Sequence, residues 1–191
     1  MSVLPRKFYE RNPAVVAREL LGKTLVSRVG NTVTAGIIVE TEAYFGKGDP
    51  ASRASRRKTP LNEIMWNRGG LAFIYMVHGN WLFNITADRV GVPGAVLIRA
   101  LEPTQGVGTM MRRRGKTSLL QLTSGPGKLT EALGITKRLH GSDVTDPKNE
   151  VTVEKGPVRK YEIASSHRIG VRKDVKRKLR FFVRGNSFVS K

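Results

Sequence analysis

Residues 71–103, LAFIYMVHGNWLFNITADRVGVPGAVLIRALEP, carry the pattern that decides the fold. Three apolar runs rich in strand-forming residues are separated by two turn sequences, Gly79-Asn80 and GVPG at 91–94. Short apolar runs divided by glycine-containing turns are typical of strands that fold back on one another. The segment therefore predicts an antiparallel meander. Its strands are expected at residues 71–78, 81–88 and 95–103.

The flanking sequence predicts more strands on both sides of the meander. Upstream, residues 24–29 (TLVSRV) and 32–44 (TVTAGIIVETEAY) are joined by a Gly-Asn pair, which is a hairpin signal. Near the end of the chain, residues 159–171 and 178–191 have the apolar pattern of two closing strands. The sheet is thus expected to be largely antiparallel.

Short helices are predicted beside these strands. Residues 14–22 follow an Asn-Pro pair that caps and starts a helix, and they end in glycine. Two further helices are predicted at residues 103–114 and 124–135. The second of these is expected to have Ser124 as its N-cap and to end at Gly134.

The longest stretch without a regular period is residues 46–70. It holds glycines, two prolines and many charges, so it is predicted to be a long loop, and long ordered loops are usually functional. Residues 138–160 are also rich in loop formers. No linker or repeat divides the chain, so residues 1–191 are expected to form one mixed α/β (α+β) domain, a curved antiparallel sheet surrounded by short helices.

Positive charge dominates the composition. The chain has 34 Lys and Arg residues against 15 Asp and Glu, a net charge of +19 with a pI of ≈ 11.0. Nucleic acid is the commonest partner with enough negative charge to explain this excess. An anionic membrane and a merely solvated basic surface are the alternatives, and no amphipathic basic helix favours the membrane.

Composition also excludes or disfavours several kinds of site. The chain has no cysteine, which excludes disulfides, thiolate metal ligands and cysteine nucleophiles. Its three histidines, His78, His140 and His167, are not at metal-ligand spacing, so no metal is expected. No apolar run approaches the roughly 20 residues of a membrane span, and residues 1–16 lack a secretory signal. The protein is therefore expected to be intracellular and soluble, in the cytoplasm or nucleoid, or in the nucleus of a eukaryote.

The strongest chemical pattern is VETEAY, at residues 39–44. Strand alternation puts Glu40, Glu42 and Tyr44 on one face. An aromatic ring can stack on a nucleobase while a neighbouring carboxylate activates water, so this pattern suits chemistry on a base. The alternative is a solvated strand end with an incidental tyrosine.

A second pattern lies in the first strand of the meander. Phe73, Tyr75 and Val77 share one face, and His78 lies at the tip of the hairpin. A bulky side chain at a tip is placed to wedge into a base stack. The alternative is a core strand that ends in a surface histidine.

Two clusters of positive charge complete the candidate site. Such clusters match contacts to backbone phosphates, although each by itself could be a solvated face. The candidate phosphate-binding residues are Arg53, Arg56, Arg57, Lys58, Arg112, Arg113, Arg114 and Lys116.

Together these segments resemble the alkyladenine (3-methyladenine) DNA glycosylase family. The resemblance runs from about residue 5 to the C-terminus. The matching pieces, in order, are IVETEAYFG, DPASRASRRKTP, GLAFIYMVHGNWLFNI, GAVLIRALEP, LTSGPGKLTEALGI, RIGVRKD and LRFFVRGNSFVS.

This resemblance implies a monomeric enzyme that flips a damaged purine out of double-stranded DNA and hydrolyses its bond to the sugar, leaving an abasic site without a lyase step. It implies Glu42 as the general base and Arg99 beside it. It also implies base-binding roles for Tyr44, Tyr75 and Asn84, of which the two tyrosines sandwich the base and the asparagine screens purines. No cofactor or metal is implied.

Two positions depart from the family pattern. Relatives commonly have histidine where this chain has Arg53. Where this chain has His78, they usually have a tyrosine that fills the gap left by the flipped nucleotide, so the resemblance implies this role for His78. If Arg53 points into the base pocket, its permanent charge disfavours cationic lesions such as 3-methyladenine and 7-methylguanine and favours neutral ones such as hypoxanthine and ethenoadenine. If it turns to a phosphate, it only adds affinity.

Three other functions fit parts of the pattern. A non-catalytic DNA- or RNA-binding protein explains the charge, but it gains nothing from Glu42 in a groove meant for phosphates. A helix-hairpin-helix glycosylase is suggested by SGPGKLTEAL, but the surroundings are rich in strands. A ribosomal protein is compatible with the net charge of +19.

Overall fold

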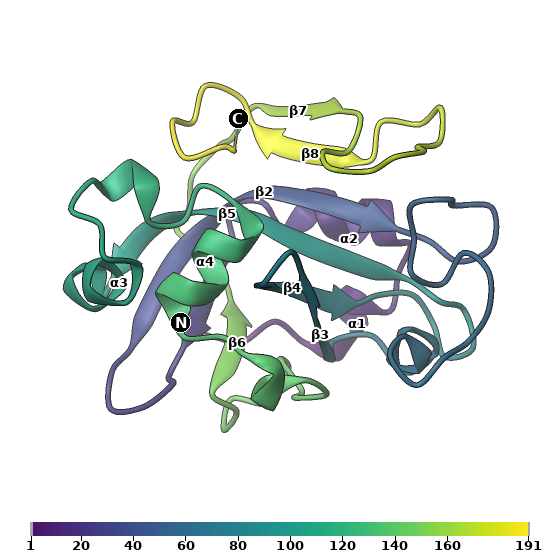
Figure 1. The fold of residues 1–191 in the computed structure, drawn as a ribbon, viewed down its shortest axis with the longest axis horizontal. Helices are drawn as coiled ribbons and strands as arrows, with labels where there is room; N and C mark the ends of the chain where they lie inside the picture. Colours follow the sequence, from purple (N-terminus) through teal and green to yellow (C-terminus); the bar gives the residue numbers. More distant parts are fainter. Residues whose placement is uncertain (1, 191) are drawn as a thin grey trace.

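The computed structural model describes residues 2–190, and an antiparallel β-sheet runs through its centre (Figure 1). Within these residues the sheet has eight strands in the order β3-β4-β5-β2-β1-β6, while β8 pairs with β2 and β7 pairs with β8. The strands are β1 (Thr24–Ser27), β2 (Thr34–Tyr44), β3 (Ala72–Val77), β4 (Asn80–Thr86), β5 (Ala95–Gln105), β6 (Val151–Glu154), β7 (Ile163–Ser166) and β8 (Arg180–Val183). The predicted α+β class, with a curved antiparallel sheet, is confirmed.

Short helices surround the sheet (Figure 1). The α-helices are α1 (Arg6–Tyr9), α2 (Pro13–Leu20), α3 (Val107–Arg114) and α4 (Pro126–Leu133), and the 3₁₀ helices are η1 (Glu63–Trp66), η2 (Leu119–Gln121) and η3 (Lys137–Leu139). None of the helices within residues 2–190 has both the length and the apolar character needed to cross a bilayer.

The predicted meander is confirmed as β3, β4 and β5, which are consecutive and antiparallel. Its first turn lies one residue earlier than expected. His78 and Gly79 occupy the two turn positions, with φ of 47° and 77°, and Val77 pairs with Asn80. Positive φ at both central residues matches the twist of a two-residue hairpin. The turn therefore places His78 at the apex, in a backbone conformation that few side chains adopt.

Strand β2 forms the middle of the sheet, and its residues from Thr34 to Ala43 are all buried. β5 pairs with one side of it, while β1 and then β8 pair with the other side. Register shifts between β2 and β5 leave Val39 and Arg99 without opposite partners. Such bulges bend a strand and redirect side chains. Here the bulge accompanies the approach of Arg99 to the carboxylates of β2.

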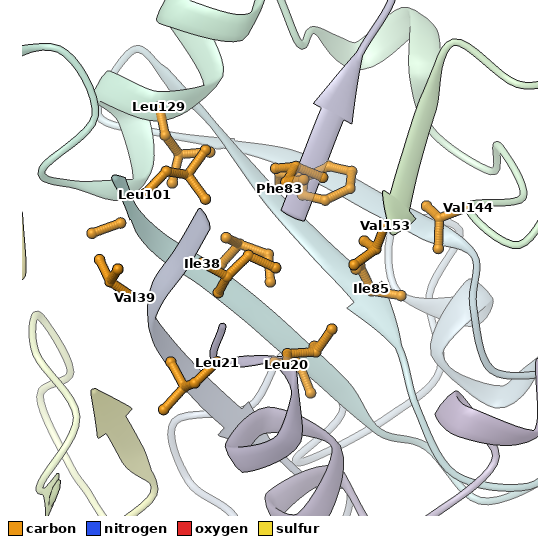
Figure 2. Packing of buried hydrophobic residues seen from close by; sticks show 14 of the residues in the cluster. Leu20, Leu21, Ile38, Val39, Phe83, Ile85, Leu101, Leu129, Val144 and Val153 are labelled. Atoms are coloured by element: carbon orange, nitrogen blue, oxygen red, sulfur yellow. The ribbon is translucent and has the colours of Figure 1, made fainter. Parts of the chain in front are cut away.

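The main hydrophobic core lies against the middle strands (Figure 2). Leu20 of α2, Ile38 of β2, Phe83 of β4, Leu101 of β5 and Leu129 of α4 all have no exposed surface. Removing a side chain of this size from water contributes roughly 1.5–3 kcal/mol. This packing fixes β2, which carries Glu42 and Tyr44, and β5, which carries Arg99.

The first predicted helix begins where its capping signal lies. The Asn12 side chain accepts a hydrogen bond from Ala14 N at 3.0 Å, and Pro13 is the first helical residue of α2. Helix α3 starts later than predicted, at Val107, because residues 103–105 continue β5.

Helix α4 confirms one terminal prediction and corrects the other. It ends at Gly134, which adopts a left-handed conformation, as predicted. Ser124 is not its N-cap, because Gly125 occupies that position and the Ser124 hydroxyl donates to Leu120 O at 2.6 Å instead.

The C-terminal third differs from the sequence-based expectation. Residues 138–160 contain the end of η3 and all of strand β6, which pairs with β1, so they are less irregular than predicted. The closing strands are present but shorter, since β8 ends at Val183 and residues 184–190 are irregular. The last residue of the predicted strand, Lys191, lies outside the described residues.

Residues 46–70 form the predicted long loop, in which η1 is the one helical segment described. Internal hydrogen bonds order it. Asn62 Nδ2 donates to Arg53 O at 2.6 Å and to Arg57 O at 3.0 Å. Asp49 Oδ2 accepts from Phe45 N at 2.9 Å, which ties the loop to the end of β2. The loop is therefore ordered by its own hydrogen bonds.

Candidate active site

A groove of about 1330 Å³ opens where several segments meet, and we call it the central groove. Its lining comes from the ends of β2 and α3, residues 48–56 of the long loop, the β3–β4 hairpin, β5, the start of α4 and the loop between β7 and β8. The described lining residues include seven cations and no carboxylate, so the groove attracts anions. The cations are Arg53, Arg56, Arg99, Arg114, Lys128, Arg172 and Lys173.

The Glu42 carboxylate lies directly behind the lining of the central groove, with no exposed surface. Its Oε2 accepts a hydrogen bond from the Tyr44 hydroxyl at 2.7 Å, and its Oε1 accepts one from Ile169 N at 2.8 Å. Arg99 Nη1 lies 3.3 Å from the same Oε1. Because Tyr44, Arg99 and Ile169 all line the groove, the carboxylate is separated from it by a single layer of residues.

Burial is the main influence on the protonation of Glu42. Removal from water raises the pKa of its carboxyl above the ordinary value. The Arg99 charge, the Ile169 N–H and the Tyr44 hydroxyl oppose this rise of the pKa without cancelling it. A carboxylate whose conjugate acid has a raised pKa is a stronger base once ionised, which suits it to accept a proton from water.

Glu40, on the same face of β2, has a different environment. Its Oε1 accepts hydrogen bonds from Arg99 Nε at 2.9 Å, Arg180 Nε at 2.7 Å and Ser190 Oγ at 2.9 Å. Its Oε2 accepts one from Ser190 N at 2.7 Å. This carboxylate is saturated with protein donors, so it holds Arg99 in place and leaves Glu42 as the candidate base. The predicted shared face of Glu40, Glu42 and Tyr44 is confirmed.

Tyr44 is fixed from behind by an arginine that sequence analysis did not single out. The Arg168 guanidinium carbon lies 4.6 Å from the centre of the Tyr44 ring. Arg168 is held in turn by Asp49 and Asp174, each at 2.6 Å from Nη2. Its position within the matching segment RIGVRKD was the only available signal, and nothing local in that segment indicates this contact.

Tyr75 contributes the second tyrosine ring of the groove. Its ring centroid lies 4.9 Å from that of Phe73, and the Arg53 guanidinium carbon lies 4.7 Å from its ring centre. Asn84 is buried nearby, and its Nδ2 donates to Phe73 O at 3.1 Å. Burial raises the pKa of Tyr75, while hydrogen bonding to Arg53 and Asn84 opposes that rise. The structure therefore turns Arg53 into the groove.

The remaining predicted residues fall into two groups. His78, Arg56 and Arg114 line the groove, and Arg114 also pairs with Glu131 of α4. A second group is exposed to solvent but lies outside the groove lining. It consists of Arg57, Lys58, Arg112 and Lys116.

Arg113 has hydrogen-bond partners within the protein. Its Nη1 donates to Ala132 O at 3.1 Å and its Nη2 donates to Val29 O at 3.2 Å. These bonds tie the end of α4 to the segment after β1. The guanidinium thus already has partners within the protein, and its predicted contact with a phosphate stays a prediction.

The residues that could bind a metal ion are dispersed. Within residues 2–190, no cluster of three or more His, Asp or Glu side chains is arranged to hold one.

A cationic groove with two tyrosine rings in front of a buried carboxylate defines the class of enzymes that act on bases in nucleic acids. The chain belongs to the methylpurine-DNA glycosylase family, whose pattern it matches over residues 7–187. It is therefore a DNA glycosylase of base excision repair, a hydrolase that acts on N-glycosyl bonds.

Similar proteins come from both bacteria and archaea. A protein of Koribacter versatilis is 39% identical over 194 residues, which cover 100% of this chain and 94% of the relative. A protein of Methanoculleus marisnigri is 42% identical over 98% of each chain. One of Methanocella arvoryzae is 43% identical over 100% of this chain and 97% of the relative. All three bear the name "Putative 3-methyladenine DNA glycosylase".

Proposed function

We propose that the protein is a monofunctional glycosylase that releases damaged purines from double-stranded DNA, with Glu42 as the general base. The observation that carries the proposal is the position of Glu42. Its carboxylate has no exposed surface, yet three of its contacts, Tyr44, Arg99 and Ile169, line the groove.

In the proposed reaction, the damaged nucleotide leaves the duplex and its sugar is seated in front of Glu42. The carboxylate accepts a proton from water while the water oxygen bonds to C1′ of the sugar. The bond from C1′ to the base nitrogen breaks, and its electron pair leaves with the base. A neutral lesion then takes a proton from solvent, whereas a cationic lesion leaves as a neutral base. Negative charge on Glu42 also stabilises the positive charge that develops on the sugar.

The absence of a lyase step is part of the proposal. Strand cleavage by a glycosylase needs an amine that forms a Schiff base with the sugar. The described contacts of the Glu42 carboxylate are a phenol, a backbone N–H and a guanidinium. These groups support hydrolysis by water.

The base is proposed to stack between Tyr44 and Tyr75, with Asn84 at its edge. Base stacking on an aromatic side chain contributes roughly 1–3 kcal/mol, which offsets extrusion. Arg53 lies against the Tyr75 ring, inside the groove. This position supports the hypothesis that its charge favours neutral lesions, such as hypoxanthine and ethenoadenine, over cationic 3-methyladenine and 7-methylguanine.

His78, at the apex of the β3–β4 hairpin, is proposed to enter the gap that the flipped nucleotide leaves. The protein is proposed to act as a monomer, without a cofactor, wherever genomic DNA lies in the cell. Positively charged side chains around the groove would bind phosphates of the duplex. These are Arg56, Arg57, Lys58, Arg112, Arg113, Arg114 and Lys116.

The test is an incubation with duplexes that each contain one modified purine, followed by alkali to cleave abasic sites. E42Q is expected to release no base while it keeps its affinity for the lesion duplex, because the amide preserves shape but accepts no proton. E63Q makes the same chemical change at an exposed residue and is expected to behave as wild type.

Equal rates for E42Q and wild type would refute Glu42 as the base. If the wild-type protein binds DNA but yields no abasic site with any modified purine, it is a non-catalytic binder and the proposed function is wrong.

A further inference from the structure

The loop between β7 and β8, residues 167–179, contributes cations that the proposed function does not use. Arg172 and Lys173 are exposed at the central groove. Neither forms an ion pair with a carboxylate in the part of the chain that the structure describes. Two neighbouring positive charges that have no partner among residues 2–190, at the edge of a groove whose described lining contains no carboxylate, are free to bind an external anion.

This loop is held in a defined shape. The Arg168 guanidinium bridges Asp49 and Asp174, with a distance of 2.6 Å from Nη2 to each carboxylate. The Arg168 N–H also donates to Asp174 Oδ2 at 3.0 Å. Residues 168–174 therefore form a turn closed at its base, so Arg172 and Lys173 extend from a preorganised segment and less ordering entropy is lost on binding.

The same loop contacts the catalytic carboxylate. Ile169 N donates to Glu42 Oε1 at 2.8 Å, and Ile169 precedes Arg172 by three residues. The backbone from Ile169 to Arg172 spans at most about 10 Å and both residues line the central groove, so an anion held by Arg172 lies on the side of the groove where the sugar faces Glu42. In a duplex seated over this site, the nearest anions are the phosphates that flank the extruded nucleotide.

We propose that Arg172 and Lys173 bind the backbone phosphates next to the extruded nucleotide. This inference rests on the proposed function and names a phosphate subsite of the same groove. The phosphates would pull on the loop that holds Glu42 and Tyr44, so binding of the backbone and positioning of the base are coupled through residues 168–173.

The test compares the salt dependence of binding to an undamaged duplex and to a lesion duplex. The variant R172Q/K173Q removes the two charges. The variant R159Q/K160Q removes the same two residue types from an exposed segment outside the groove lining, where Arg159 lies 3.8 Å from Glu102, and is the control. Thermal unfolding of both variants checks that they are folded.

Loss of two phosphate contacts is expected to reduce the slope of log K against log salt by about 1.8, at about 0.9 per contact. Between 50 and 200 mM salt, the affinity of wild type should therefore fall about 12-fold more than that of R172Q/K173Q. The control should retain the wild-type slope.

A slope for R172Q/K173Q equal to that of wild type, or a reduction of the same size in R159Q/K160Q, would overturn the proposal. The outcome is independent of catalysis. A reduced slope in R172Q/K173Q together with no base release by the wild-type protein would sustain the subsite and refute the proposed function. Base release by the wild-type protein together with an unchanged slope in the variant would do the reverse. If R172Q/K173Q reduced the salt dependence of binding to an acidic protein but not of binding to DNA, the two cations would belong to a protein-binding surface and the DNA subsite would be overturned.

Discussion

The hydrogen bond from the Tyr44 hydroxyl to Glu42 Oε2, at 2.7 Å, makes a specific prediction about pH. Y44F removes this donor but keeps an aromatic ring in the groove. A hydrogen bond to a charged group contributes about 1.5–3 kcal/mol, and about 1.36 kcal/mol corresponds to one pH unit. The lost donor favoured the ionised carboxylate, so the pKa of Glu42 rises further above its ordinary value. The base must be ionised to act, and activity is lost as pH falls through that pKa.

The measurement is the single-turnover rate of base release against pH, at saturating enzyme. The acid limb of the Y44F profile is expected about one to two pH units above that of wild type, with rates that converge at high pH. Y75F is the matched control, since it removes the other tyrosine hydroxyl of the groove. An acid limb that stays in place for Y44F, or that moves equally for Y75F, would refute the assignment of Glu42 as a base tuned by Tyr44.

Two further predictions concern lesion choice and stability. R53H, assayed at pH 8 where histidine is largely neutral, removes a positive charge from beside Tyr75. Unit charges about 6 Å apart repel by about 3 kcal/mol near a protein surface, so the rate of base release for 7-methylguanine relative to hypoxanthine should rise about ten- to a hundredfold. An unchanged ratio would contradict the neutral-lesion hypothesis. E42Q should unfold at a higher temperature than wild type at pH 7–8. The pKa of Glu42 is raised in the folded state, so ionisation of its carboxyl destabilises the fold as pH rises past the ordinary pKa of a glutamate. Glutamine stays neutral and avoids this loss of stability. About 1 kcal/mol corresponds to about 2–4 °C in a protein of this size; calorimetry that shows no gain, or a gain that persists at pH 4, would exclude this linkage.

Local rules were sufficient for part of the fold and site. Alternation along a strand placed Glu40, Glu42 and Tyr44 on one face, because the backbone imposes a period of two whatever the tertiary context. The cap at Asn12 was predictable for a similar reason, since the side chain bonds to an amide two residues away.

Other features depend on packing between distant segments, and a single sequence carries no signal for them. Ile169 donates to Glu42 across 127 positions of the chain, and Arg168 reaches Asp49 across 119. The bulge at Arg99 arises where β2 exchanges β1 for β8 as its neighbour, which alternation within one strand cannot reveal.

The prediction of Ser124 as an N-cap was wrong for a related reason, because the local rule had a competitor. The Ser124 hydroxyl bonds backward to Leu120 O and leaves the capping position to glycine. Arg113 belongs to a run of three arginines on α3, but only its guanidinium reaches the carbonyls at the end of α4. Positive charge alone did not indicate which of the three arginines makes this contact.

The left-handed backbone at His78 limits how evolution can reshape the hairpin apex. Valine and isoleucine fit poorly at such φ values because of their branched Cβ, while glycine and asparagine adopt them readily but supply little volume. A larger wedge at this position must bear backbone strain of about 1–3 kcal/mol, or the turn must gain residues that relax it. Inserting residues into the turn is thus an easier way than substituting His78 to place a bulkier side chain at the apex of the hairpin.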